Sequence, residues 1–463
     1  MIGLIARREL LEFIRDRRLF WAGGIILLLL AIALLVGWQQ QRTLNAERAA
    51  AQQLDYDDWV SQAERHPHDA AHQGMHVFKP EAPLAVVDPG ITPYVGSTQW
   101  LQAHRQADLK FVPAQDATGL QRFGNLSVAW VLQVLGPLLV IVLGFNAFAA
   151  EREQGTLRQL MSIGVTPQRL LLGKALALSV ALALLLVPAA VVIAFVSLSG
   201  LEAGLQYDTL MRLLVLFAGY AIYLSIFIFL TLAVSGRTST SRIALMALMA
   251  VWITGVILAP RAISDLADRW YPTPSRVEFN NSMDQELSKT YADAWQASFG
   301  VSTRWGADLP LNRWGEALQV DDQAGYLVAD RHFAELWGAF DKQRQLQEWS
   351  GLVFPVLALR SFSMGIAGSD FSAHRDFSLA AEQQRRLMQD LISHDLIHHA
   401  DVLDHQHFTY KADSTLWKQI PPFDYRLPTM EAVLPANIRS LGILSLALLV
   451  SFVLALASVP RRA

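Results

Sequence analysis

The 463-residue sequence contains no cysteine and few charged residues. Without cysteine the chain forms no disulfide and offers no thiolate ligand to a metal. Charged residues make up only 17% of the chain and hydrophobic residues 52%, which is too apolar for an ordinary soluble protein of this length. The net charge of −3 gives no electrostatic footprint for a nucleic acid, so we expect no nucleic-acid partner.

The sequence also lacks the motifs of nucleotide-binding and hydrolytic enzymes. Gly173-Lys174 looks like the end of a phosphate-binding loop, but Ala175 replaces the Ser or Thr that binds magnesium. Gln168 stands where that motif has its first glycine. There is no GxSxG sequence and no HExxH sequence. SHDLIHH has two histidines at the HExxH spacing, but Asp395 stands where that motif has its glutamate. We therefore expect no catalysis by this chain.

The hydrophobic residues are gathered in six uncharged stretches. Each has about 18 residues or more, enough for a helix to cross about 30 Å of hydrocarbon. The stretches are 19–41, 123–150, 175–200, 213–236, 243–260 and 440–460. They predict six transmembrane helices. The first is too long for the core of a signal peptide, so we expect it to be an anchor.

The charges of the connecting segments predict the orientation of these helices. Four of the segments each have a net charge of +2: 1–18, 151–174, 237–242 and 461–463. The other segments, 42–122, 200–212 and 261–439, have net charges of −3, −1 and −7. The positive-inside rule then places both termini in the cytoplasm and the two long segments outside. All twelve histidines lie in these two long segments.

The expected fold is mainly α, with a six-helix transmembrane domain and a mostly helical extracytoplasmic domain built from two inserts. Residues 42–60 have helical character and continue the first span outward, whereas 66–94 has Pro and Gly punctuation typical of loops. An extended return is expected at 420–428. We divide the chain into 1–41 (amphipathic interfacial helix and first span), 42–122 (insert), 123–260 (spans two to five), 261–439 (large outer domain) and 440–463 (last span and tail).

A short charged segment, EREQGTLRQLMSIGVTPQRLLLGK, follows the second expected span. Its residues Leu157, Leu160 and Ile163 have helical spacing. Gly164 can end that helix, and Pro167 can begin the next one. We interpret the segment as a short helix that lies flat at the cytoplasmic surface.

The same segment resembles the signature of type-2 ABC transporter permeases. RRELLEFIRDRRLF near the N-terminus is similar to the interfacial helix of that family. PHDAAHQGMHVFKPEAPLAVVDPG, VFPVLALRSFSMGIAGSD and WKQIPPFDYRLP resemble the subgroup that carries the DUF3526 domain. The signature positions are Glu151, Glu153, Gly155, Thr156, Leu157, Leu160, Pro167, Arg169, Gly173 and Lys174.

The resemblance implies that 155–165 is a coupling helix of a permease in the bacterial plasma membrane. It implies that a separate ATPase subunit, acting as a dimer, binds ATP and Mg²⁺, and that a second copy or a related permease completes the pathway. The residues expected to serve this coupling are Glu151, Glu153, Gly155, Thr156, Leu157, Leu160, Pro167 and Arg169. We expect an exporter. The alternative is an outer-face binding or assembly module that transmits mechanical work and moves no solute.

Histidines in the two outer segments are candidate ligands for zinc or copper. One set clusters within eleven residues, and the second has i, i+4 spacing on an expected helix, which lets two imidazoles share a metal. The candidates are His66, His68, His72, His76, His394 and His398. The alternative is that these are ordinary loop and surface histidines.

Overall fold

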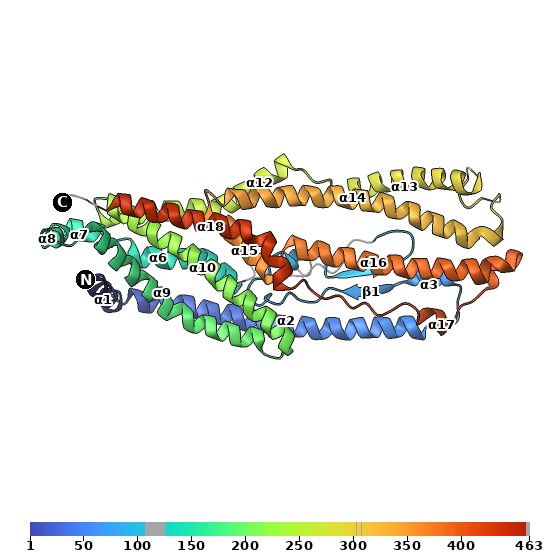
Figure 1. Ribbon diagram of the computed structural model, residues 1–463, viewed down its shortest axis with the longest axis horizontal. Coiled ribbons are helices and arrows are strands. Elements are labelled where there is room, and N and C mark those ends of the chain that lie inside the picture. The colour runs from blue at the N-terminus through green and yellow to red at the C-terminus, as the bar shows by residue number, and fades with distance from the viewer. Residues whose placement is uncertain (107–125, 302, 307, 460–463) are drawn as a thin grey trace.

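The computed structural model describes residues 1–106, 126–301, 303–306 and 308–459, which form an elongated array of helices (Figure 1). Among these residues six helical stretches are long and apolar enough to span a membrane, which confirms the expected number. They are Arg18–Ser61, Val128–Glu153, Pro167–Leu198, Ala203–Arg237, Ser241–Trp270 and Met430–Ser458.

These spans form the first of two regions, which we call the membrane domain. Its helices surround one hydrophobic cluster. They are α1 (Ile2–Arg15), the first part of α2 (Arg18–Ser61), α5 (Val128–Trp130), the π-helical turn η3 (Val131–Leu135), α6 (Gly136–Gly144), α7 (Ala149–Glu153), α8 (Thr156–Ser162), α9 (Pro167–Leu198), α10 (Ala203–Arg237), α11 (Ser241–Trp252), the π-helical turn η4 (Ile253–Leu258), α12 (Ala259–Trp270) and α18 (Met430–Ser458).

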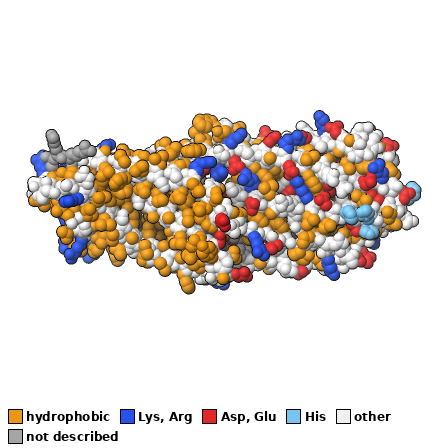
Figure 2. All heavy atoms as spheres, in the orientation of Figure 1, with side chains coloured by type: hydrophobic (Ala, Val, Ile, Leu, Met, Phe, Trp, Pro, Cys, Tyr) orange, Lys and Arg blue, Asp and Glu red, His pale blue; other side chains and the backbone are white. Residues whose placement is uncertain are grey.

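The second region, the distal domain, extends away from the chain termini and has hydrophobic clusters of its own. It contains the last part of α2 together with α3 (Pro67–Gln73), β1 (Met75–Phe78), η1 (Thr92–Tyr94), β2 (Thr98–Leu101), α13 (Arg276–Phe299), η5 (Leu311–Arg313), α14 (Trp314–Ser350), α16 (Phe371–Asp395), η6 (Leu396–Ala400), η7 (Asp401–Thr409) and α17 (Ser414–Trp417). Figure 2 shows the difference in surface between the regions: hydrophobic side chains cover most of the membrane domain, and charged side chains and histidines are frequent on the distal domain.

The helix α2 belongs to both regions. Its 44 residues correspond to about 66 Å at 1.5 Å per residue, more than twice the thickness of a hydrocarbon core. Near its far end, Trp59 Nε1 donates a hydrogen bond to the carbonyl oxygen of Trp417, 3.2 Å away. The expectation that 42–60 continues the first span as a helix is confirmed.

The expectation that 66–94 is entirely loop is wrong. Pro67 occupies the first turn of α3, where a missing N–H costs nothing, and Gly74 ends the helix at φ +59°. The next residues form β1, which pairs antiparallel with β2 from Met75 opposite Leu101 to Phe78 opposite Thr98. A side chain at Gly74 would place its Cβ 2.1 Å from the Leu101 carbonyl oxygen. Tertiary pairing therefore orders a segment whose local pattern is that of a loop.

One helix of the 261–439 segment packs within the membrane domain. This helix, α15 (Pro355–Ala367), buries Leu359, Phe362 and Ile366 in the hydrophobic cluster that contains the spans. Its close approach to α10 depends on Gly219, where an added Cβ would lie 2.2 Å from the ring of Phe362. Farther along the chain, residues 421–429 are neither helix nor strand and lead back to the last span, where an extended return was expected at 420–428.

Candidate coupling site and its supports

The short helix predicted between the second and third spans is present as α8. It lies with α1, α7 and the end of α18 at the extremity of the membrane domain that faces away from the distal domain (Figure 1). Gly155 at φ +72° precedes the helix and Gly164 at φ +86° follows it. These left-handed conformations favour glycine, and they let the chain turn sharply on both sides of α8.

The predicted coupling residues differ in how far they are buried. Leu157 is buried in the membrane-domain cluster and Leu160 packs against that cluster. Thr156 Oγ1 donates a hydrogen bond to the Glu151 carbonyl oxygen, 3.2 Å away, which fixes the first turn of α8. At the other end, Pro167 begins α9, and the backbone N–H of exposed Arg169 donates to Thr166 Oγ1 at 3.4 Å.

The Glu151 side chain lies inside the molecule. Its Oε1 is 3.0 Å from Lys174 Nζ, and Glu9 Oε1 of α1 is 2.6 Å from the same nitrogen. All three residues are buried, with Lys174 only 1% exposed. Burial raises the pKa of Glu9, and the charge of Lys174 acts in the opposite direction. We call Glu9, Glu151 and Lys174 the charge cluster; it joins α1, α7 and α9.

The glycine before this lysine has a separate role. An added Cβ at Gly173 would lie 2.6 Å from Ile5 Cγ2 and 3.2 Å from the Ile2 carbonyl oxygen. Only a glycine therefore allows α1 to approach α9 closely enough for Glu9 to reach Lys174. The Gly-Lys pair that looks like part of a nucleotide-binding loop serves to pack one helix on another.

Glu153 and its neighbours connect α7 to the ends of α10 and α11. Glu153 accepts hydrogen bonds from the backbone N–H and the hydroxyl of Ser241, at 3.1 and 2.7 Å. Arg152 Nη2 donates to the Gly236 carbonyl oxygen at 2.6 Å. Ser235 Oγ accepts from the N–H of Phe148, 3.0 Å away. Together with the contact of Glu151 with Lys174, these hydrogen bonds connect the segment that precedes α8 to α9, α10 and α11.

The surface that α8 leaves open consists of residues outside the predicted set. Its exposed side chains are uncharged except for one arginine, and Ile163, just beyond the helix, is 73% exposed. These residues are Arg158, Gln159, Ser162 and Ile163. An exposed isoleucine beside a cation, on a helix anchored from behind, provides an apolar and basic surface for contact with another protein.

The charge cluster is the part that the sequence did not reveal. Glu9 stands on the first helix and Lys174 at the start of the third span, 165 positions apart, so no local pattern relates them. One signal was available. Glu9 is adjacent to Leu10 and close to Phe13, so the apolar face of α1 carries an acid that needs a partner if it is buried.

The far end of α10 is held by another buried cation. Arg212 Nη1 donates to the Ile366 carbonyl oxygen of α15 at 2.8 Å, and its Nη2 donates to the Pro428 carbonyl oxygen at 2.5 Å. Its Nε is 2.6 Å from Asp208 Oδ2, and Asp208 Oδ1 accepts from the Met430 N–H at the start of α18. A single side chain therefore joins α10, α15 and the return to α18.

A buried chain of hydroxyls lies deeper between the same helices. Ser363 Oγ of α15 donates to Asp88 Oδ2 at 2.5 Å and is 3.0 Å from the Tyr220 hydroxyl of α10. That hydroxyl accepts from Gln133 Nε2 in η3, also at 3.0 Å. Asp88 belongs to the 42–122 insert, so these side chains link the insert to two spans.

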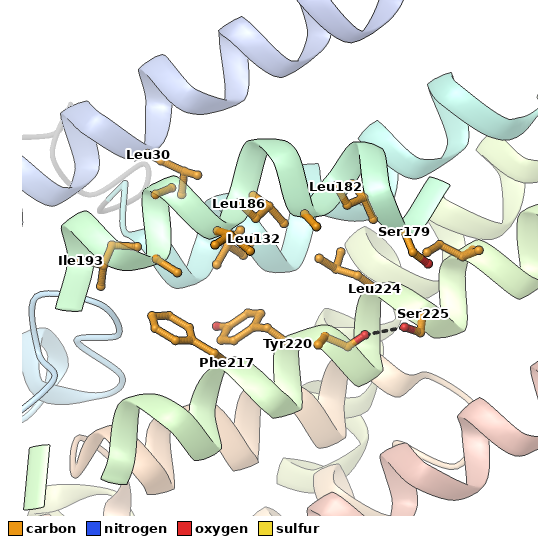
Figure 3. A pocket seen from close by; sticks show the side chains of 16 residues that line it. Leu30, Leu132, Ser179, Leu182, Leu186, Ile193, Phe217, Tyr220, Leu224 and Ser225 are labelled. Carbon is orange, nitrogen blue, oxygen red and sulfur yellow. Dashed lines mark hydrogen bonds between the residues drawn. The ribbon is translucent and has the colours of Figure 1, made fainter. Parts of the chain in front are cut away.

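A cavity of about 350 Å³ lies between α2, η3, α9 and α10 (Figure 3). Leu30, Leu132 and Phe217 project into it, and its lining is almost entirely apolar. Its polar lining groups include the Ser225 hydroxyl, which donates to the Ala221 carbonyl oxygen 2.7 Å away. The cavity suits a hydrocarbon chain better than an ion, because none of the residues that line it carries a charge.

The predicted histidine ligands are distributed over several environments. His76 Nδ1 is 3.0 Å from Asp55 Oδ1, and His66 is buried against His407, with ring centroids 5.3 Å apart. The remaining four form two pairs with short Nε2–Nε2 distances. These are His68 with His72, at 3.1 Å, and His394 with His398, at 3.0 Å.

Two models of known families match the chain. The chain is a helical integral membrane protein. The model of the ABC-2 family transporter proteins matches residues 4–288, more than half of the chain, and the chain therefore belongs to this family. A domain of unknown function, DUF3526, matches residues 266–426. No curated protein matches the chain. Both parts of the resemblance seen in the sequence are confirmed.

Membership of the family defines the role of the chain in general terms. It is a membrane permease subunit of an ABC transporter, and such subunits are membrane components rather than catalytic ones. The family implies an ABC ATPase as the partner that supplies energy.

Proposed function

We propose that the chain is a permease whose α8 docks on a separate ATPase subunit at the cytoplasmic face. ATP-driven closure of an ATPase dimer would move α8, and the spans would carry the movement to the distal domain outside. Two copies of the chain, or this chain with a related permease, form the complete pathway. Export is the direction that a large outer domain favours.

The observation that carries this proposal is the contrast between the two faces of α8. Behind it, Leu157 and the charge cluster anchor the segment to α1, α7 and α9. In front, Arg158 and Ile163 are exposed. A helix that is fixed to the spans and exposed on its other face transmits displacement rather than absorbing it. In this proposal Glu151 and Glu153 position α8, and the exposed residues touch the partner.

A second function is favoured by the contacts at the far end of α10. Arg212 and Asp88 connect the spans to α15 and to the 42–122 insert. Such contacts suit a subunit that transmits mechanical work to clients on the outer face without moving a solute. The two functions differ in whether ATP hydrolysis is accompanied by transfer of a compound across the bilayer.

The test uses the full chain in nanodiscs, together with the ABC ATPase that co-purifies with it. Ile163→Asp and Arg158→Glu should each lower ATPase retention and lipid-dependent ATPase activity at least about tenfold, the effect of losing about 1.4 kcal/mol of binding energy. Arg242→Glu is the matched control, because Arg242 is exposed at the same end of the membrane domain but outside α8. That variant should behave as the unaltered chain does.

Unchanged retention and activity in both α8 variants would overturn the docking proposal. Sealed vesicles that contain the complex then separate the two functions. ATP-dependent loss of an apolar dye from the bilayer or lumen supports export, whereas ATP turnover without any transfer supports mechanical work on outer clients.

A further inference from the structure

Three histidines of the 42–122 insert meet in the distal domain. They are His68, His72 and His104, and their nearest ring nitrogens all lie within 4.8 Å of one another. His104 was not among the predicted ligands, because it lies 32 positions from His72, with both β1 and β2 between them. Within the described residues, no other group of three or more histidines and carboxylates is so close together.

Helix and strand geometry bring these rings together. His68 and His72 are one turn apart on α3, so both project from the same face. His104 follows β2, and the hydrogen bond from the Ala103 N–H to the Ala71 carbonyl oxygen, 3.0 Å long, ties this segment to α3. His104 has φ +71°, a conformation that non-glycine residues seldom adopt. The ring centroid of His104 lies 4.9 Å from that of His72 and 5.2 Å from that of His68.

The distances fit a shared metal ion. Two nitrogens that each bind zinc at about 2.0–2.1 Å in tetrahedral geometry are about 3.3 Å apart. The two Nε2 atoms of His68 and His72 are 3.1 Å apart, and a ring nitrogen of His104 lies within 4.8 Å of a ring nitrogen of each. A hydrogen bond between two neutral imidazoles can account for the 3.1 Å distance between His68 and His72. It does not account for the position of the His104 ring beside them.

The environment supports ligand binding by neutral imidazoles. His68 and His104 are partly buried, and burial favours the neutral imidazole, which is the form that binds a metal. His72 is exposed and leaves the site open to solvent. Trp314 forms an apolar wall, with its ring centroid 5.0 Å from that of His68.

Two cations lie near this site, and both are paired. Arg304 Nη2 is 2.8 Å from Asp321 Oδ2, and Arg385 Nη2 is 2.7 Å from Glu382 Oε1. Their charges act on His104 in the direction that disfavours another cation. Their carboxylate partners offset much of this repulsion, because an ion pair presents little net charge at a distance.

We propose that His68, His72 and His104 bind one Zn²⁺ ion, with the fourth coordination position open. Three imidazoles without a thiolate or a carboxylate are typical of Zn²⁺ and Cu²⁺ sites, and they exclude Ca²⁺ and Mg²⁺, which prefer oxygen ligands. An open position lets a water molecule or a donor group of a client complete the coordination. The site belongs to the distal domain and does not depend on the docking of α8.

The test is zinc binding by the full chain in nanodiscs, purified without a polyhistidine tag and stripped with a chelator. Zn²⁺ is titrated at pH 7.5 against a chromophoric chelator, with Cu²⁺ and Ca²⁺ in parallel experiments. We expect one tightly bound Zn²⁺ per chain and no competition by Ca²⁺. Co²⁺ in place of Zn²⁺ should give the intense visible absorption of a four-coordinate site.

Two variants and a matched control localise the metal. His104→Asn keeps a residue that tolerates left-handed backbone, and His72→Ala changes an exposed side chain, so both should fold. Each should weaken Zn²⁺ binding at least about tenfold, the lower bound found even for loss of a ligand's hydrogen-bond partner. His398→Ala is the control, because it breaks a histidine pair of nearly the same Nε2–Nε2 distance that has no third ring.

The outcomes are decisive in either direction. Loss of Zn²⁺ and of the Co²⁺ absorption in His104→Asn and His72→Ala, with unchanged binding in His398→Ala, establishes the site. Absence of tight Zn²⁺ binding by the unaltered chain overturns it, as does loss of binding in His398→Ala alone. Cu²⁺ generally binds a nitrogen site more tightly than Zn²⁺ does. Only a preference for Cu²⁺ beyond this general order, at the same three residues, would assign Cu²⁺ to the site in place of Zn²⁺.

Discussion

At the end of the membrane domain that carries α1 and α8, a lysine and two carboxylates are buried together, whereas at the other end one buried arginine binds backbone carbonyl oxygens. Lys174 contacts Glu9 and Glu151, so α1 is held to α7 and α9 by charge. Arg212 donates hydrogen bonds to the carbonyl oxygens of Ile366 and Pro428, so the return from the distal domain is held through its backbone.

The two ends therefore differ in which elements they join. The charge cluster joins elements that belong to the membrane domain, and its role is to keep α8 fixed relative to the spans. The contacts of Arg212 join α10 to α15 and, through the Pro428 carbonyl oxygen, to the segment that returns from the distal domain. Displacement of α10 along its axis would be transmitted at both ends, since both ends carry buried polar contacts.

The largest effect is expected at the charge cluster. Lys174→Met leaves two buried carboxylates without a cation, and breaking a buried pair in this way costs about 3–5 kcal/mol. Thermal melting in detergent, followed by tryptophan fluorescence, measures the loss. The matched control adds Glu9→Gln and Glu151→Gln, which removes all three charges and should restore most of the stability. Equal melting of Lys174→Met and the unaltered chain contradicts a structural role for the cluster.

A smaller effect is expected at the opposite end of α10. Arg212→Met removes hydrogen bonds to two carbonyl oxygens and to Asp208, which should cost about 2–3 kcal/mol. Hydrogen exchange of the backbone should rise around Pro428 and at the start of α18. Arg237→Met is the control on the same helix, because Arg237 is exposed and should contribute little. If both variants melt alike, Arg212 does not join the two regions.

The smallest effect is expected at Asp88, the buried carboxylate that accepts a hydrogen bond from Ser363 of α15. Burial raises the pKa of Asp88 above its ordinary value of 3.8, although the hydrogen bond from Ser363 and the charge of Arg360 oppose the change. The folded chain therefore retains the proton to a higher pH than the unfolded chain. Stability then falls as the pH rises from about 4 until Asp88 ionises in the fold.

Asp88→Asn has no such dependence, so its stability should rise relative to that of the unaltered chain between pH 4.5 and 7.5. Melting curves at both pH values measure this difference. Asp268→Asn is the control, because Asp268 is exposed and has the same change of side chain. A constant difference between Asp88→Asn and the unaltered chain across this range contradicts the ionisation of a buried carboxyl.

The sequence predicted the membrane domain well for a physical reason. A span in hydrocarbon satisfies its own backbone hydrogen bonds and exposes apolar side chains, so each helix leaves a local and continuous signal. The six spans were deduced in this way, whereas the helical continuation at 42–60 and the short helix now seen as α8 were predicted from helical patterns in polar segments. The prediction failed at 66–94, where β1 is ordered by pairing with a strand that lies 20 residues farther along the chain.

Site residues were harder to deduce than helices. Glu151 and Glu153 stand in a charged segment, and the family resemblance implied that both serve coupling to the ATPase partner. The structure shows Glu151 bound to Lys174 and Glu153 bound to Ser241, while Arg158 and Ile163 occupy the open surface. Which face of a seven-residue helix is exposed depends on the elements packed against it, and about two helical turns carry too little periodicity to decide this.

The sequence by itself determined the class of this protein: its apolar stretches require a bilayer, and its signature segment fixes the family. Only the tertiary structure decided the partners of its buried polar groups. Glu9 and Lys174 are 165 positions apart, and His104 reaches His72 across a strand pair. Burial makes an unpaired polar group costly, so such groups find partners in the fold, but sequence distance places no limit on where those partners lie.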